Sequence, residues 1–293
     1  MVQATRHVVT RFAPSPTGRL HIGHGWSALM ACDAARESNG TFRLRIEDID
    51  GTRSRLEHID GILEDLTWLG IGWAGEPVIQ STRVSAHRAA LDRLIGEGLA
   101  YPCFCTRADI LAQIAASGSA PHGPEGMIYP GTCREMNLEE RHRRLEEGQA
   151  HAWRLDIAQS VARAGALRWH DERQGWIDAE PSAAGDIVLS RKDAPGSYHL
   201  CVTLDDAKMG VTLVVRGRDL FEATHVHRLL QALLDLPTPA YRHHALLVDA
   251  EGRRLAKRDA GLTLFALRAE GRSGTELAGD LRAGRFPLGI RVA

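Results

Sequence analysis

The chain has 293 residues, of which 44% are hydrophobic and 25% are charged. This length and composition predict a folded protein with a substantial buried core and exclude a disordered or collagen-like chain. Lys and Arg number 36 and Asp and Glu 37, so the chain as a whole does not attract polyanions, and any contact with nucleic acid must come from a local basic patch.

The first third of the chain alternates between strand and helix patterns. A β-rich run at 7–12 precedes a helix rich in Ala and Leu at 22–37. Apolar and charged residues then alternate over 42–47 with the period of a strand, and amphipathic helices are predicted at 56–69 and 85–98. Because strands that alternate with helices pair in parallel, we expect an α/β fold with a parallel sheet and helices on both of its faces.

The middle of the chain, residues 101–185, differs in composition and predicts an insertion into this pattern. It holds three cysteines and a loop rich in Gly and Pro. It also contains a helix whose first turn carries Asn137 and Glu140 at the spacing of a capping box.

The α/β pattern resumes after the insertion. Strands are predicted at 186–190, 198–204 and 211–216, and a helix opened by Asp219 follows them. An apolar strand at 245–248, a basic loop and two short helices complete the chain.

The sequence RFAPSPTG at 11–18, followed by His21, Gly23 and His24, is the strongest motif of the chain. Two prolines stiffen the passage from the strand to a helix that begins near His21, and the N–H groups of a helix N-terminus attract anions. His21 and His24 are three residues apart, so both imidazoles project from one side of the first turn. Since Gly23 has no side chain, a flat base can approach the backbone. The motif therefore predicts a nucleotide site with its phosphates at this helix end.

A second motif is the run RRLAKR at 253–258, which places four cations in six residues. Such a run is usually a solvated surface. Its position in a loop after the closing strand favours another role, because a basic loop there can neutralise the leaving pyrophosphate of a triphosphate.

Together the two motifs resemble the signatures of class I aminoacyl-tRNA synthetases of the glutamyl type. The tetrapeptide at 21–24 matches the HIGH signature letter for letter, and RFAPSPTG is similar to the run that precedes it in the glutamate-activating branch. The segment at 254–258 resembles the KMSKS loop of these enzymes. Arg254, Ala256 and Arg258 differ from that signature, so Lys257 is its one clean match.

The resemblance implies a Rossmann-type fold that binds ATP with Mg²⁺. It places His21, Gly23 and His24 at the nucleotide, and Lys257 on the leaving phosphates. His21, His24 and Lys257 would act as the catalytic residues through positioning and charge stabilisation, without a nucleophilic side chain.

A glutamate site is also implied by the resemblance. Its contact residues are Arg11, Ala13, Ser15, Glu47, Tyr198 and Arg216. The guanidinium fork of Arg11 suits a carboxylate, and Glu47 resembles the acidic residue that receives the ammonium group of the amino acid.

The sequence predicts a cytoplasmic protein. The N-terminus has no apolar signal region, and no apolar run reaches the roughly 18 residues of a membrane span. In a cytoplasmic protein the cysteines are not expected to form disulfides.

Cys103, Cys105 and Cys133 predict a metal site. Three thiolates would form a closed, structural Zn²⁺ site, one per chain. The spacing C-x-C…Y-x-x-x-C is similar to that of the glutamyl-Q tRNA(Asp) synthetase family, which implies Tyr129 as the fourth ligand. His122 is an alternative ligand, and free buried cysteines are an alternative to a metal site.

The end of the chain bears on the choice within the family. Residues 258–293 are too few for another domain of usual size, so we expect no anticodon-binding domain, as in the truncated glutamyl-Q tRNA(Asp) synthetases. The predicted organisation is a catalytic domain at 1–100 and 186–240, an insertion with the zinc site and tRNA contacts at 101–185, and the KMSKS-like loop with short helices at 241–293.

The resemblance implies a monomer that activates L-glutamate with ATP in the absence of tRNA. It would transfer the glutamyl group to the queuosine base in the anticodon stem-loop of tRNA(Asp), with no membrane involved. Two alternatives stay open. One is the catalytic part of a glutamyl-tRNA synthetase that charges a tRNA 3′ end, and the other is a zinc-stabilised RNA-binding protein without catalysis.

Overall fold

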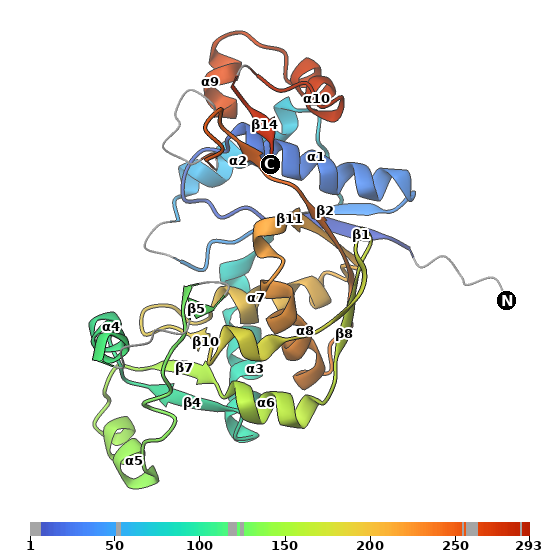
Figure 1. Ribbon diagram of the computed structural model, residues 1–293. Helices are drawn as coiled ribbons and strands as arrows, with labels where there is room; N and C mark the ends of the chain where they lie inside the picture. Colours follow the sequence, from blue (N-terminus) through green and yellow to red (C-terminus); the bar gives the residue numbers. More distant parts are fainter. Residues whose placement is uncertain are drawn as a thin grey trace, which may run out of the picture.

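The computed structural model describes residues 7–50, 54–116, 122–123, 126–253, 255, 263–287 and 289–293. The chain forms an α/β fold in which helices pack on a parallel sheet (Figure 1). Within the described residues, no helix combines the length and the apolar character that crossing a bilayer requires.

The N-terminal part of the sheet has three parallel strands, in the order β1-β2-β3. Its elements are β1 (Val9–Phe12), α1 (Ile22–Glu37), β2 (Thr41–Ile46), α2 (Leu56–Trp68) and β3 (Val78–Ile79). Each crossover between neighbouring strands contains a helix, as parallel pairing requires. The strand, helix and strand predicted over 7–46 are therefore confirmed, and α1 has the predicted bounds.

The sheet continues on the other side of β1. The N–H of Thr212 donates to Val9 O over 2.9 Å, and the N–H of Val9 donates to Thr212 Oγ1 over 2.8 Å, which brings β11 beside β1. The strands of this part, in spatial order, are β11 (Leu213–Gly217), β12 (Ala240–His244), β8 (Arg168–Asp171) and β9 (Gly175–Asp178). Residues 168–178, which were predicted to be part of the insertion, thus extend the main sheet next to β12.

A second, antiparallel sheet carries the insertion. Its strands are β10 (Val188–Ser190), β7 (Ala152–Leu155) and β4 (Ala100–Cys103). The insertion also contains α4 (Arg107–Ala116) and α5 (Leu138–Glu146), at the lower left of Figure 1, and the short strands β5 (His122–Gly123) and β6 (Gly126–Met127). The predicted cap of α5 is present, because Asn137 Oδ1 accepts the N–H of Glu140 over 2.8 Å.

A layer of helices joins the two sheets. It consists of α3 (Val84–Gly96), α6 (Ile157–Ala164), α7 (Tyr198–Lys208) and α8 (Ala223–Leu233). These helices share one apolar cluster that includes Leu94, Ile157, Leu200 and Leu230. The 3₁₀ helices η1 (Gln80–Arg83), η2 (Pro181–Ala184) and η3 (Arg218–Leu220) connect neighbouring elements.

Two predictions in this layer are wrong. Residues 198–204 were expected to form a strand, but they form the first turns of α7. The helix is buried on most of its circumference, from His199 to Asp206, so its sequence lacks an amphipathic period and a short apolar run is then indistinguishable from a buried strand. Asp219 does not cap α8, because the chain first makes the 3₁₀ turn η3, and α8 begins after Glu222 without a side-chain cap.

The C-terminal elements pack on α1 and α2, and the two predicted terminal helices are present. They are α9 (Leu264–Ala269) and α10 (Gly274–Arg282), with β13 (Leu247–Val248) and β14 (Arg291–Val292) paired antiparallel beside them. Thr263 and Ser273 cap the two helices with their side chains. These caps are a local reason for the helices to begin where they do.

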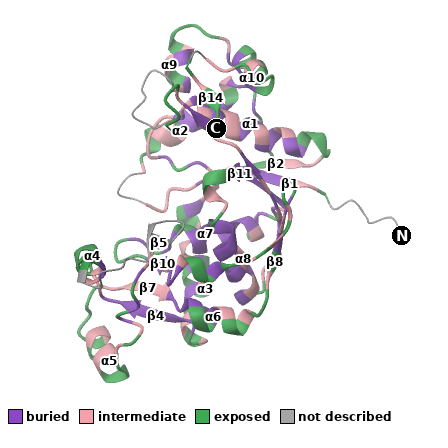
Figure 2. Cartoon of the chain, in the orientation of Figure 1, coloured by how far each residue is buried: buried purple, intermediate pink, exposed green. Residues whose placement is uncertain are grey.

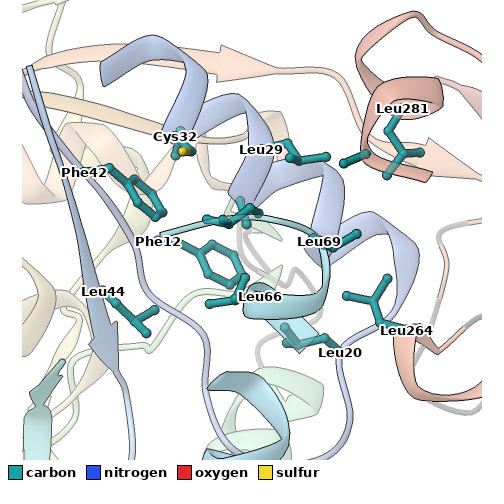
Figure 3. Close-up of a cluster of buried hydrophobic side chains, with 14 of the residues drawn as sticks. Phe12, Leu20, Leu29, Cys32, Phe42, Leu44, Leu66, Leu69, Leu264 and Leu281 are labelled. Atoms are coloured by element: carbon teal, nitrogen blue, oxygen red, sulfur yellow. The ribbon is translucent and has the colours of Figure 1, made fainter. Parts of the chain in front are cut away.

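The main apolar core lies between the parallel sheet and the helices α1, α2, α9 and α10. Figure 2 shows the buried residues concentrated along the strands and the helix faces that meet them, whereas α5 has no buried residue. Side chains from both layers meet in Figure 3: Phe12, Phe42, Leu44, Leu29, Leu66, Leu69 and Leu281. This core holds β1 and α1 together, and so it positions the loop between them.

Substitution of Gly274, the first residue of α10, should destabilise the fold. A Cβ atom there would lie 2.0 Å from the carbonyl oxygen of Trp68, so Gly274→Ala is expected to lower the free energy of unfolding by about 1–3 kcal/mol. A Cβ atom at Gly279 on the same helix would have open space around it, with no atom of the described residues within 4 Å, and Gly279→Ala should stabilise by up to about 1 kcal/mol. Urea unfolding of both variants checks this, and equal midpoints would contradict it.

Candidate active site

The two histidines of the HIGH sequence cap the N-terminus of α1. His21 is the N-cap residue, and its Nδ1 accepts the N–H of Gly23 over 3.1 Å. His24 Nδ1 accepts the N–H of His21 over 3.2 Å, and the two rings stack with their centroids 3.7 Å apart, as their spacing predicts. Because each Nδ1 accepts a hydrogen bond, a neutral ring carries its proton on Nε2. The helix end therefore presents two imidazole N–H donors, which suit phosphate oxygens.

A cavity of about 310 Å³ opens beside this helix end. Residues from β1, α7 and β11 line it together with the HIGH turn and Glu47, which directly follows β2. Of the predicted site residues it contains Arg11, Ala13, His21, Gly23, His24, Glu47, Tyr198 and Arg216. The structure thus brings the predicted nucleotide and glutamate residues to one cavity, although they are spread over more than two thirds of the chain.

Ser15 lies in a neighbouring, larger cavity of about 540 Å³. This cavity runs between the main sheet and the insertion, where Tyr129 and Arg154 also line it. Glu47 and Tyr198 line both cavities, so these two side chains stand between them. A group bound at Glu47 or Tyr198 is accordingly accessible from either side.

The floor of the smaller cavity is a network of buried charges. Arg11 donates to both carboxylate oxygens of Asp206, over 3.0 and 3.2 Å, and Arg45 donates to Asp206 over 2.6 Å. Arg45 also donates to Glu47 over 2.9 Å. Burial raises the pKa of Asp206, but Arg11 and Arg45 outweigh it and hold the pKa at about 2. The positive charges of two guanidinium groups therefore balance the negative charges of two carboxylates in this network.

Sequence reasoning missed Arg45 and Asp206. The alternation over 42–47 places Arg45 on the same side as Arg43, but Arg45 is fully buried while Arg43 is exposed. Asp206 lies on the helix that was predicted as a strand. The sequence did contain one signal that could have identified Arg45. It is a second arginine, two residues before Glu47, in a strand whose other face is apolar.

Arg216 enters the same cavity from β11 and is 5% exposed. Its Nη1 donates to the hydroxyl of Tyr198 over 3.5 Å, and its Nη2 donates to Thr224 Oγ1 over 2.7 Å. The side chain is thus held at the cavity wall by groups from α7 and α8.

Lys257 lies outside the described residues, as do Arg254, Ala256 and Arg258. The described residues on each side of this segment reach the HIGH turn. Leu255 lines the smaller cavity, and Thr263 forms an antiparallel bridge with His21. The described residues Leu255 and Thr263 therefore both lie beside the turn that carries the two imidazoles.

The three clustered cysteines come together at the end of β4 and in the loop before α5. The ligand atoms of Cys103, Cys105 and Cys133 all lie within 4.8 Å of one another, so these residues could hold a metal ion. The hydroxyl of Tyr129 lies 3.5 Å from Cys105 Sγ and accepts the N–H of Cys133 over 2.9 Å. A hydrogen bond from Cys103 lowers the pKa of Cys133 to about 4, against the opposing effect of burial. The side chain of His122, the alternative ligand, lies outside the described residues.

Comparison with known proteins identifies the family of the chain. A family model described as tRNA synthetases class I (E and Q), catalytic domain, matches residues 7–274. A glutamyl-Q tRNA(Asp) synthetase of Rhodobacter capsulatus is 46% identical over 275 residues, which cover 92% of this chain and 98% of that protein. One of Symbiobacterium thermophilum is 42% identical, with 92% of this chain and 84% of that protein covered.

Longer proteins are also similar. A glutamate–tRNA ligase of a Synechococcus species is 39% identical over 90% of this chain and 55% of its own length. The crystal structure of a glutamate–tRNA synthetase from Elizabethkingia anophelis has a TM-score of 0.72 and 28% identity, covering 87% of this chain and 53% of that chain. This chain thus spans about half the length of that structure.

The α/β fold, the cavity at the HIGH turn and the match over residues 7–274 lead to one conclusion: the chain belongs to the class I tRNA synthetases of the E and Q type and is an ATP-dependent ligase.

Proposed function

We propose that the chain activates L-glutamate with ATP in the absence of tRNA and transfers it to the queuosine base in the anticodon loop of tRNA(Asp), acting as a monomer. The observation that carries the first step is the single cavity in which the capped end of α1 meets Arg11, Glu47 and Arg216. The similarity to relatives named glutamyl-Q tRNA(Asp) synthetase supports the second step.

In the first step a carboxylate oxygen of glutamate attacks the α-phosphorus of ATP in line. A P–O bond forms to the glutamyl carboxylate while the bond to pyrophosphate breaks, giving glutamyl-adenylate. His21 and His24 donate Nε2–H groups to the phosphate region, and Gly23 admits the adenine ring. When bound with ATP, Mg²⁺ would neutralise charge on its phosphates. Lys257 stabilises the leaving pyrophosphate, an assignment supported by Leu255 and Thr263, which both reach this turn.

The glutamate is held by groups of opposite charge on two sides of the cavity. Glu47 accepts the ammonium group, while Arg11 and Arg216 face the carboxylates. Ala13, Ser15 and Tyr198 complete the site. Since Glu47 and Tyr198 line both cavities, the acceptor base can reach the activated glutamyl group from the larger one.

This assignment gives the segments of the chain different roles. Residues 1–100 and 186–240 form the catalytic domain, and 101–185 form an insertion that bears the metal site and contacts tRNA. Residues 241–293 supply the basic loop and the helices that support it. Strands β8 and β9 belong to the catalytic sheet although they lie within the range of the insertion.

The cysteine cluster binds one structural Zn²⁺ through Cys103, Cys105, Cys133 and Tyr129. Around a tetrahedral Zn²⁺ two sulfurs stand roughly 3.8 Å apart, and a sulfur and an oxygen roughly 3.5 Å apart. The distances from Cys105 Sγ to Cys133 Sγ and to the Tyr129 hydroxyl are both 3.5 Å, which fits this arrangement. Soft thiolate ligands also favour Zn²⁺ over Mg²⁺.

The function is tested by two assays on the purified chain. Glutamate-dependent exchange of pyrophosphate into ATP is expected without tRNA. Labelled glutamate should then appear on tRNA(Asp) that contains queuosine, and not on the same tRNA lacking it or on tRNA(Glu). Labelling of tRNA(Glu) would instead assign the chain to 3′-end charging, and RNA binding without exchange would reject catalysis.

Removal of either phosphate-facing group should slow the exchange reaction. A hydrogen bond to a charged group contributes about 1.5–3 kcal/mol, so His24→Ala and Lys257→Ala are each expected to lose roughly ten- to a hundredfold in kcat. Lys208→Ala, at an exposed position near the end of α7, serves as a control and should retain the wild-type rate. Rates of both test variants equal to that of the control would refute these roles.

Loss of one cysteine of the cluster should release the metal. The purified chain is expected to contain about one zinc ion, and Cys105→Ser to contain little, because a three-ligand site holds Zn²⁺ weakly. Cys32→Ser changes a buried cysteine outside the cluster and should keep the metal. Elemental analysis measures the content, and a zinc-free wild type or a zinc-loaded Cys105→Ser would argue against the site.

A further inference from the structure

Arg216 is a buried cation whose polar partners are all neutral. Within the described part of the chain, no carboxylate oxygen lies within ion-pair distance of its guanidinium group. Its partners are Thr224 Oγ1 at 2.7 Å, Leu220 O at 3.0 Å, His243 Nε2 at 3.2 Å, His227 Nδ1 at 3.3 Å and the Tyr198 hydroxyl at 3.5 Å. Such a charge is costly to bury unless an anion joins it.

The other two arginines of the site differ in this respect. Arg11 and Arg45 both bind Asp206, and Arg45 also binds Glu47. Their positive charges are therefore already balanced by the protein. Among these three, Arg216 is the one whose charge no carboxylate of the described residues neutralises.

Asp171 determines which nitrogen of His243 faces Arg216. Its Oδ2 lies 2.8 Å from His243 Nδ1 and also accepts the backbone N–H of His243. Because a carboxylate only accepts, Nδ1 carries the proton and Nε2 is left as an acceptor for the Nε–H of Arg216. Burial, together with the charge of Arg216, lowers the pKa of His243 to about 4, so the ring is neutral at pH 7.

His227 holds the opposite end of the guanidinium in the same way. Its Nδ1 faces Arg216 Nη1, and its Nε2 lies 3.2 Å from His199 Nδ1. As Arg216 can only donate, Nδ1 of His227 accepts, and its Nε2 donates to His199. Burial is the main cause that lowers the pKa of His227 well below its usual value, with Arg216 adding to it.

We propose that Asp171 and His243, with His227 and Thr224, are positioning residues that orient Arg216 through neutral acceptors and leave its charge for the carboxylate of the amino acid. None of the four needs to touch the substrate. The inference rests on the proposed function in one respect, the assignment of glutamate as the ligand of Arg216. The proposal adds Asp171 to the residues of the site. Asp171 reaches the site because β8 pairs with β12, where Tyr241 and Asp171 are partners.

The test separates the acceptor role of His243 from its packing. His243→Phe keeps a ring but removes the acceptor, while His243→Gln restores an acceptor near the position of Nε2. The Kd for L-glutamate, measured by calorimetry, should rise roughly ten- to a hundredfold in the Phe variant, as expected for a lost hydrogen bond to a charged group. The Gln variant should lie within a few fold of wild type. KM for ATP in the exchange reaction should be unchanged in both.

A second comparison tests whether Asp171 acts through His243. Asp171→Ala is expected to weaken glutamate binding in the wild-type background but to have little further effect in the His243→Phe background. Additive effects, a Phe variant that binds like wild type, or equal losses in the Phe and Gln variants would each overturn the positioning role. A parallel rise of KM for ATP would also overturn it, since it indicates a general structural defect.

These outcomes are distinguishable from failure of the proposed function. A wild-type chain that binds L-glutamate but catalyses no exchange would reject the proposed activity, and the binding constants of the variants would still decide the positioning role. A wild-type chain that does not bind L-glutamate would reject both.

Discussion

The site depends on the contacts that the carboxylate of Asp206 makes. This carboxylate accepts hydrogen bonds from Arg11 on β1 and Arg45 on β2, and so it ties these two strands to the helix α7. All three side chains are almost inaccessible to water. Loss of one partner from such a cluster leaves a buried charge without compensation, which typically costs about 3–5 kcal/mol. The same cluster fixes Glu47, through Arg45, at the wall between the two cavities.

The charged and polar groups of the site lie at different positions around this network. The balanced pairs form the floor, the histidine-capped end of α1 presents imidazole groups, and Arg216 supplies a positive charge that no carboxylate of the described residues balances. This arrangement suits a small zwitterion next to a polyphosphate, because each charged group of the ligand meets a group of opposite sign or an N–H donor. The helix end contributes without a lysine or arginine of its own, since two imidazoles occupy the capping positions.

The insertion contributes a surface rather than part of this cavity. Its antiparallel sheet and the cysteine cluster lie on the far side of the larger cavity, which Tyr129 and Arg154 line from that side. Tyr129 also touches the cysteine cluster, and Arg154 lies 4.0 Å from the centre of its ring. Tyr129 thus contacts both the cysteine cluster and the larger cavity.

Local sequence by itself determined the features that depend on residues close together in the chain. The bounds of α1, the stacked pair His21 and His24, and the cap of α5 follow from contacts within three or four residues, which periodicity and capping rules describe. The parallel α/β fold followed from the order of such segments. Tertiary structure alone decided that residues 198–208 form a helix and that Arg45 is buried, because both depend on burial among distant elements. It also decided that Asp206 joins Arg11 and that Asp171 reaches His243. Each of those contacts closes a long loop of chain, and a side chain carries no local signal of the partner it will meet across such a loop.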